Sequence, residues 1–150
     1  LRTRRQRQMC IRDSHNGNGV RHKVKNIGSN DINVILIEHK KLGSIPNFDN
    51  NVKLSAHAVS PDIYEIVHED ELIKVYTATF PAGSGDNVHE HGMNTAYVIT
   101  GGKVEITGAD GSVNERNIPD GAVLHSDKLV RHQVKNIGTT DIKVLLAEYK

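Results

Sequence analysis

The sequence predicts an all-β domain over residues 51–150, in which short strands close into a barrel or a two-sheet jelly roll. Apolar and polar residues alternate with a period of two through most of this region, as they do in half-buried strands. Turn residues interrupt the alternation at short intervals, and no segment has the periodicity of an amphipathic helix. Closure is expected because it covers the exposed edges of many short strands.

About eight or nine short strands are expected in this domain. In chain order they cover residues 63–67, 72–80, 95–99, 103–106, 112–118, 122–126, 130–134 and 142–148. A tight turn is expected at residues 68–71, and the Gly- and Pro-rich stretch 81–85 breaks the chain. Gly101-Gly102 and Asp110-Gly111 have the composition of two-residue hairpin turns, so we expect the strands on either side of each to pair.

The charge of the chain is unevenly distributed. The total is +1, but residues 1–14 contain five arginines and one aspartate, so the remaining residues carry a net charge of −3. An acidic body offers no basic face to a phosphate backbone, and no apolar run approaches the roughly 18 residues that cross a bilayer. We therefore expect neither a nucleic acid nor a membrane as partner. The single cysteine, Cys10, lies in the leader, which excludes a disulfide framework or a Cys-based site in the domain.

The first fourteen residues are interpreted as a non-native leader. Residues 4–14, RRQRQMCIRDS, resemble the in-frame translation of a transposon-type sequencing-library adapter over all eleven positions. A disordered basic tail and a nucleic-acid-binding arm are the alternatives. Segments of this kind are set aside before fold reasoning. We expect the natural N-terminus to be missing and the protein to be cytoplasmic, although a signal peptide stays open.

A repeat links the two ends of the chain. Residues 20–40 match residues 130–150 at 14 of 21 positions with a constant offset of 110, about the length of one small β domain. We interpret residues 15–42 as the last two strands of a truncated preceding domain of a tandem repeat, and residues 43–50 as a linker. A duplication introduced during sequence assembly is the alternative. The unpartnered strand 33–38 is expected to join the barrel's sheet or to pair with a second copy in a homodimer.

Two histidines indicate a metal site. His89 and His91 are two residues apart, so in a strand both side chains point to one face. Imidazole nitrogens bind zinc, copper, iron or nickel, and a further ligand is expected from a different strand, where His132 is placed. The alternative is a pair of exposed histidines at the start of a strand.

These residues belong to two motifs by which the domain resembles the cupin superfamily over essentially all of residues 51–150. The first motif has a glycine, His-x-His, a glutamate and a second glycine. Gly83, His89, His91 and Gly102 stand at the matching positions, and Thr95 stands at the position of the glutamate.

The second cupin motif ends the domain. Gly121, His132 and Asn136 match it, whereas Asp127 and Leu129 replace its proline and second glycine. The domain is most similar to small single-motif cupins, a group that has no agreed substrate.

The resemblance implies a cupin double-stranded β-helix in which His89, His91 and His132 bind a divalent metal, which can be iron, zinc, copper, nickel or manganese. Thr95 in place of glutamate leaves three neutral ligands and open positions for water or an anionic molecule. A degenerate site retained only for its fold is the alternative.

Strand parity suggests which other side chains surround this site. Thr95, Tyr97 and Ile99 share a face and are expected to line the cavity, while Glu90 and Asn94 are expected to face solvent. Tyr97 is a weak catalytic candidate, with a core position as the alternative. His125 is the other weak candidate, as a fourth ligand or general base, with a surface position as the alternative.

Three functions are consistent with these features. The first is a metal-dependent enzyme, of oxygenase or isomerase type, that acts on a small polar molecule. The second is a non-enzymatic domain that binds or senses a small-molecule ligand with a degenerate metal site. The third is the structural half of a two-domain protein whose activity lay in the truncated repeat. A fold alone does not choose among them.

Overall fold

The computed structural model describes residue 21, residues 23–37 and residues 51–150. The leader, the linker 43–50, and residues 15–20, 22 and 38–42 of the interpreted truncated domain lie outside the described residues. The chain divides into two compact units, Leu1–Pro46 and Asn47–Lys150.

Strands make up most of the second unit. In chain order its elements are α2 (Ala56–Val59), β1 (Tyr64–Glu69), β2 (Ile73–Phe80), β3 (His89–His91), β4 (Asn94–Thr100), β5 (Gly102–Gly108), β6 (Val113–Ile118), β7 (Val123–Ser126), β8 (Val130–Asn136) and β9 (Ile142–Tyr149). The eight expected strands are present, and β3 and the single-turn helix α2 are additions. No helix in the part of the chain that the structure describes is long and apolar enough to span a membrane.

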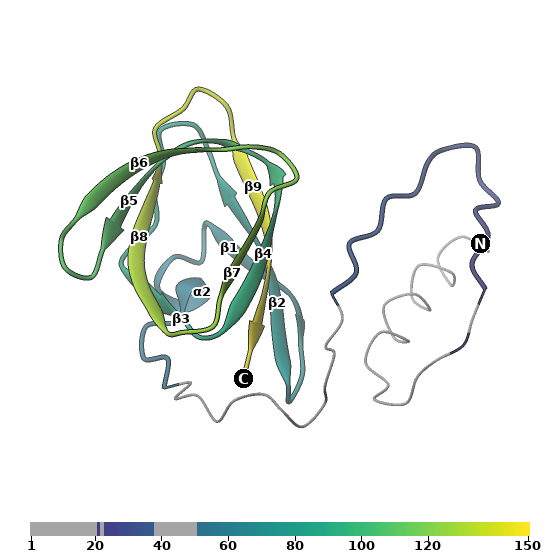
Figure 1. Cartoon of the computed structure of the whole chain (residues 1–150), viewed down its shortest axis with the longest axis horizontal. Helices are drawn as coiled ribbons and strands as arrows, with labels where there is room; N and C mark the ends of the chain where they lie inside the picture. Colours follow the sequence, from purple (N-terminus) through teal and green to yellow (C-terminus); the bar gives the residue numbers. More distant parts are fainter. Residues whose placement is uncertain (1–20, 22, 38–50) are drawn as a thin grey trace. The chain divides into compact units, whose positions relative to one another are not determined.

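The strands form two antiparallel sheets, which confirms the all-β fold class. The five-stranded sheet has the order β1-β2-β9-β4-β7, and the four-stranded sheet has the order β3-β8-β5-β6. Figure 1 shows the two sheets curving around a common interior, with β4, β7 and β9 on one side and β5, β6 and β8 on the other. Strands far apart in sequence, such as β2 and β9, are therefore neighbours.

Of the two expected hairpins, the one predicted at Gly101-Gly102 was wrong. β4 pairs with β7 and β9, whereas β5 pairs with β6 and β8, so Gly101 lies where the chain crosses from one sheet to the other. Glycine is required there because a Cβ atom at residue 101 would overlap the carbonyl oxygen of Ile118. The hairpin at Asp110-Gly111 is confirmed, since β5 and β6 pair directly and Gly111 has a positive φ of 80°.

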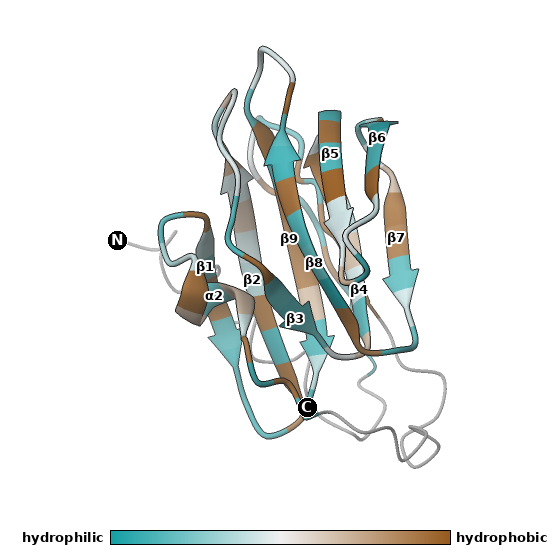
Figure 2. Ribbon diagram, turned by 90° about the vertical axis from the view of Figure 1, so that its left-hand side faces the viewer, coloured by the Kyte–Doolittle hydropathy of each residue, from teal (hydrophilic) through white to brown (hydrophobic). Residues whose placement is uncertain are grey.

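The core lies between the inner faces of the sheets. Tyr76, Leu146 and Ala96 are directly paired neighbours on β2, β9 and β4 and point to the same side, where all three are buried. Aliphatic and aromatic side chains fill the rest of this layer. In contrast, β6 at the edge of the four-stranded sheet is hydrophilic along most of its length and exposed (Figure 2).

Asn136 fixes the hairpin that carries both β8 and β9. Its side chain is fully buried, its Nδ2 donates hydrogen bonds to the carbonyl oxygens of Phe80 and Thr140, and its Oδ1 accepts one from the Gly138 amide. Buried backbone groups need hydrogen-bonding partners, and the Asn136 side chain provides one to each of these three groups. The loop between β8 and β9 is thereby tied to the end of β2.

The first unit repeats this turn. The Gly28 amide donates to Asn26 Oδ1 at 2.9 Å and Asn26 Nδ2 donates to the Asn30 carbonyl oxygen at 2.8 Å, the same two bonds that Asn136 makes with Gly138 and Thr140. The expected strand 33–38 joins no sheet in its described part, residues 33–37.

Candidate metal centre

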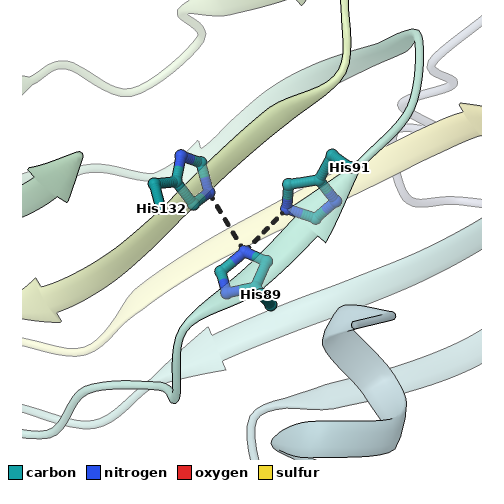
Figure 3. A group of neighbouring side chains, drawn as sticks. All are labelled: His89, His91 and His132. Atoms are coloured by element: carbon teal, nitrogen blue, oxygen red, sulfur yellow. Dashed lines mark hydrogen bonds between the residues drawn. The ribbon is translucent and has the colours of Figure 1, made fainter. Parts of the chain in front are cut away.

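Three histidines meet in the interior of the second unit. β3 provides His89 and His91, and β8 provides His132, which is the direct cross-strand partner of His89. Because paired residues and residues two apart share a face, the three rings point toward one another (Figure 3). The Nε2 atom of His89 lies 2.9 Å from that of His91 and 3.0 Å from that of His132.

The hydrogen bonds of two rings determine which nitrogen faces the centre. Nδ1 of His89 lies 2.9 Å from the carbonyl oxygen of Asn87, which can only accept, so this nitrogen carries the proton. Nδ1 of His91 lies 2.9 Å from Oε2 of Glu148, to which it donates in the same way. In the neutral rings both Nε2 atoms therefore present lone pairs to each other at 2.9 Å, an arrangement that a cation between them would stabilise.

The spacing of the nitrogens suits a transition metal. Metal–nitrogen bonds of about 2.0–2.1 Å place two imidazole nitrogens on one ion about 2.9 Å apart at a right angle and about 3.4 Å apart at the tetrahedral angle. The two shortest distances agree with the first value, and the donor atoms of all three residues lie within 4.8 Å of one another. The donor set and its spacing therefore fit a divalent metal.

Burial keeps two of the rings unprotonated. Desolvation, with the neighbouring His91 as a smaller cause, lowers the pKa of His89 to about 4. Desolvation followed by His89 and His91 lowers the pKa of His132 to about 3. Both rings are therefore neutral near pH 7, which is the form that binds a metal.

A buried carboxylate stands behind His91. Glu148 is 7% exposed, and its Oε2 accepts a hydrogen bond from the Tyr76 hydroxyl at 2.9 Å as well as from His91. Burial and the adjacent Glu148 raise the pKa of Tyr76 above its usual range, so the hydroxyl remains a donor. A carboxylate on the far nitrogen of a ligating histidine fixes the ring and increases its basicity.

A second carboxylate stands behind His89. The side chain of Asp86 is fully buried, and its Oδ2 lies 3.4 Å from Nδ1 of His89 and accepts a hydrogen bond from the Tyr64 hydroxyl at 2.7 Å. Its Oδ1 accepts another from the Val134 amide at 2.7 Å. Burial raises the pKa of Asp86 to about 6, although both of these hydrogen bonds act in the opposite direction.

Thr95 and His125 lie apart from the three histidines. Thr95 pairs with Ala147 and His125, so it points to the opposite face from Ala96, and its Oγ1 lies 2.9 Å from Nδ1 of exposed His125. The prediction that Thr95 and the residues sharing its face line the cavity was therefore wrong, because the alternate residues of β4 face inward. Tyr97 has the parity of Thr95 and is half-buried on the same outer face.

The two residues expected in solvent are buried instead. Asn94 lies on the inner face of β4 opposite Glu148, and its Nδ2 donates to the Gly92 carbonyl oxygen. Glu90 accepts hydrogen bonds from the amides of Lys53 and Leu54, the former lowering its pKa the most, and so attaches the start of the domain to β3. Parity failed for Glu90 because the segment before α2 covers the outer side of β3.

The carboxylate partners of the site are not evident from the sequence. Glu148 stands at the end of a predicted strand, and Asp86 stands in a predicted loop. The repeat contains one signal, because its glutamate is kept in both copies, as Glu38 and Glu148. Asp86 has no such signal, since its role depends on the tertiary contact with Tyr64.

Comparisons with known proteins agree with this architecture. No family model matches the chain, and no curated protein matches its sequence. A cupin domain from Bordetella pertussis Tohama I aligns with a TM-score of 0.54 at 24% identity, covering 59% of this chain and 92% of that one. An RmlC-like cupin family protein with a double-stranded β-helix fold, from Methanocaldococcus jannaschii, aligns with a TM-score of 0.50 at 16% identity, covering 58% and 78%. The second unit therefore has the cupin double-stranded β-helix fold.

Proposed function

We propose that the protein binds one divalent transition metal through the Nε2 atoms of His89, His91 and His132 and presents it to a small polar molecule. The observation that carries this proposal is the convergence of the three Nε2 atoms while the opposite nitrogens of His89 and His91 are held by Asn87 and Glu148. Such an ion supplies Lewis acidity to a bound water or substrate oxygen when coordination positions remain open.

The chain's own residues define where the small molecule approaches. His89 and His91 are buried, whereas His132 is half-buried, so the centre meets solvent on the side of His132. Thr95 lies on the outer face and places no carboxylate on the ion. Glu148 and Asp86 provide negative charge behind the rings of His91 and His89, which offsets part of the charge that three neutral ligands leave.

Enzymatic and non-enzymatic uses of this site differ in whether the bound molecule is converted to a product. A metal-dependent oxygenase or isomerase acting on a small polar molecule is the use we favour, because three protein ligands leave coordination positions of a divalent metal open to an exogenous ligand. A binding or sensing domain would use the same approach without turnover.

The test is metal analysis of protein purified without chelator, followed by reloading with iron, zinc, copper, nickel or manganese. We expect close to one equivalent in the parent and loss of metal in the His89→Ala/His91→Ala variant. His125→Ala, which removes a histidine from the outer face, should bind as the parent does. Metal well below one equivalent after every reloading contradicts the proposal. Oxygen consumption with small acids and thiols then separates an oxygenase from a binder.

A further inference from the structure

A buried tyrosine reaches the metal-facing side of the three histidines. Tyr64 begins β1, and its pairing with Ala78, which is also buried, directs its side chain into the barrel. The hydroxyl oxygen of Tyr64 lies 3.4 Å from Nε2 of His89. This nitrogen faces the centre, since Nδ1 of the same ring is bonded to the carbonyl oxygen of Asn87. Tyr64 therefore approaches the centre from the five-stranded sheet, whereas the histidines come from the four-stranded sheet.

The hydroxyl proton of Tyr64 points away from the centre. The hydroxyl donates to Oδ2 of Asp86 at 2.7 Å, and a carboxylate at this distance is a stronger acceptor than an imidazole nitrogen at 3.4 Å. Because the proton is used in this bond, the lone pairs of the oxygen remain on the side of Nε2 of His89, which carries no proton either. The two atoms therefore face each other with lone pairs, as the Nε2 atoms of His89 and His91 do.

The distance between this oxygen and His89 fits two donors of one ion. With metal–ligand bonds of about 2.0–2.1 Å, two donor atoms at the tetrahedral angle lie about 3.4 Å apart. The hydroxyl oxygen of Tyr64 is 3.4 Å from Nε2 of His89. The Nε2 atoms of His91 and His132 lie 2.9 and 3.0 Å from the same nitrogen. His89 thus has three donor atoms around it at ligand spacing, two nitrogens and one oxygen.

Packing holds the Tyr64 hydroxyl in place. The ring contacts those of Tyr76 and His89 edge-on, with centroid distances of 5.7 and 5.5 Å, and only 5% of Tyr64 is exposed. Asp86, which accepts the hydroxyl proton, is itself held by the amide of Val134. A donor that is fixed before an ion binds loses little conformational entropy on binding.

Strand β4 leaves the centre without a carboxylate. Thr95, at the position of the motif's glutamate, faces outward. Asn94 and Ala96, the inward residues on either side of it, carry no charge. The oxygen atom beside His89 comes from Tyr64 on β1 instead.

We propose that Tyr64 is a fourth protein ligand of the metal, an oxygen donor that Asp86 orients. This inference rests on the proposed function, because it assigns a further residue to the same ion. A hydrogen bond to a carboxylate increases the basicity of a ligand, and Asp86 serves Tyr64 in this way as Glu148 serves His91. Tyr64 is buried, so it leaves the half-buried side of His132 to the small molecule.

Zinc affinity of two matched variants tests the assignment. Tyr64→Phe and Tyr76→Phe each keep the ring and remove a hydroxyl that donates to a buried carboxylate. The hydroxyl of Tyr76, however, lies 2.8 Å from Nδ1 of His91, on the side of that ring away from the centre. We expect Tyr64→Phe to bind zinc at least about tenfold more weakly than Tyr76→Phe, since loss of an outer-sphere partner alone costs about 10- to 100-fold. Equal affinities of the two variants overturn the proposal.

The tyrosine spectrum gives a readout that a structural role would not change. The protein has four tyrosines and no tryptophan, so its near-ultraviolet absorption comes mainly from tyrosine. Zinc does not absorb in this range, and its binding to a hydroxyl oxygen should shift the absorption of that tyrosine. We expect the parent and Tyr76→Phe to share a zinc-induced difference spectrum that Tyr64→Phe lacks. A difference spectrum that persists in Tyr64→Phe overturns the proposal.

The remaining tyrosines provide a test that does not require Tyr64→Phe to fold. Tyr97 and Tyr149 have the outward parity of the five-stranded sheet, and each is replaced by phenylalanine in turn. A difference spectrum that keeps its full size in Tyr76→Phe, Tyr97→Phe and Tyr149→Phe comes from Tyr64. Its loss in any one of these three variants contradicts the proposal.

Cobalt(II) in place of zinc reports on the ion itself, because its visible absorption depends on the number and kind of its ligands. Tyr64→Phe should change the spectrum of bound cobalt, whereas Tyr76→Phe should keep that of the parent. If the parent binds no metal, the proposed function and the role of Tyr64 both fail. If the parent binds one metal ion and Tyr64→Phe has the same affinity and the same cobalt spectrum, the role of Tyr64 fails and the proposed function stands.

Discussion

The carboxylate of Glu148 lies 2.9 Å from Nδ1 of His91 and holds this ring with its other nitrogen toward the metal centre. The Tyr76 hydroxyl donates to the same oxygen at 2.9 Å, so the carboxylate is itself held in place. Glu148 comes from β9 of the five-stranded sheet and His91 from β3 of the four-stranded sheet. The contact therefore ties the two sheets together at the site.

Loss of the Glu148 charge should weaken metal binding. Glu148→Gln removes the negative charge behind His91 and should lower the affinity about 10- to 100-fold, the usual effect of losing an outer-sphere partner of a ligand. Zinc affinity measured in competition with a chromophoric chelator reports the change. His125→Ala is the control, because its ring bonds to Thr95 on the outer face and its loss should leave the affinity unaltered. Equal affinities of Glu148→Gln and the parent would remove Glu148 from the site.

The stability of the metal-free protein should depend on pH. Burial lowers the pKa of His89 from 6.5 to about 4 and that of His132 to about 3. The contributions of the two rings to the free energy of unfolding are complete above about pH 6.5, where the rings are neutral in both the folded and the unfolded protein. These contributions are lost as the pH falls toward the pKa values of the folded protein. Asp86 acts oppositely: its pKa is raised from 3.8 to about 6, so its contribution is complete below pH 3.8 and is lost as the pH rises through 6.

On unfolding in this pH range, the two histidines take up more protons than Asp86 releases. The free energy of unfolding should therefore decrease as the pH falls from 6.5 to 4. Urea denaturation of chelator-treated protein across this range measures the decrease, which amounts to about 1.4 kcal/mol per pH unit for each net proton taken up on unfolding. Asp86→Asn removes the opposing proton and should steepen the slope. A flat profile would show that the histidines are not buried as neutral rings.

Asn136 should contribute strongly to stability. Asn136→Ala deprives buried backbone groups of Phe80, Thr140 and Gly138 of their partners. Each such loss costs about 1–3 kcal/mol, less where water enters, so we expect a decrease of about 3 kcal/mol in urea denaturation. Asn26→Ala removes the same bonds from the exposed copy and should change stability by less than about 0.5 kcal/mol. Similar effects of the two substitutions would contradict a role for burial.

The crossing between the sheets should not tolerate a side chain at residue 101. A Cβ atom there would overlap the backbone of Ile118 and Pro119, so Gly101→Ala should lower the unfolding free energy by at least about 2 kcal/mol. Gly28→Ala is the matched control, since its Cβ would meet only the Asn26 side chain at an ordinary contact distance. Thermal denaturation of both variants measures the difference. Unchanged stability of Gly101→Ala would mean that the crossing can relax.

Much of the fold could be predicted from local patterns. Period-two alternation and turn residues located β1, β2 and β4 to β9, because these signals depend only on a strand's own residues. The hairpin predicted at Gly101-Gly102 was wrong, since a tight turn between strands does not reveal whether those strands pair. The short β3 was not predicted, as three residues are too few to show alternation.

The sequence alone predicted that His89, His91 and His132 would share a site, the first two from their HxH spacing in a strand and His132 from its place in the second motif by which the domain resembles the cupins. Only the tertiary structure decided what surrounds them. The carboxylates of Glu148 and Asp86 reach the rings through contacts between distant segments, and Thr95 faces away because the pairing of β4 with β9 fixes its side. Spacing along a chain specifies neighbours on one strand, whereas partners across sheets depend on how the sheets close.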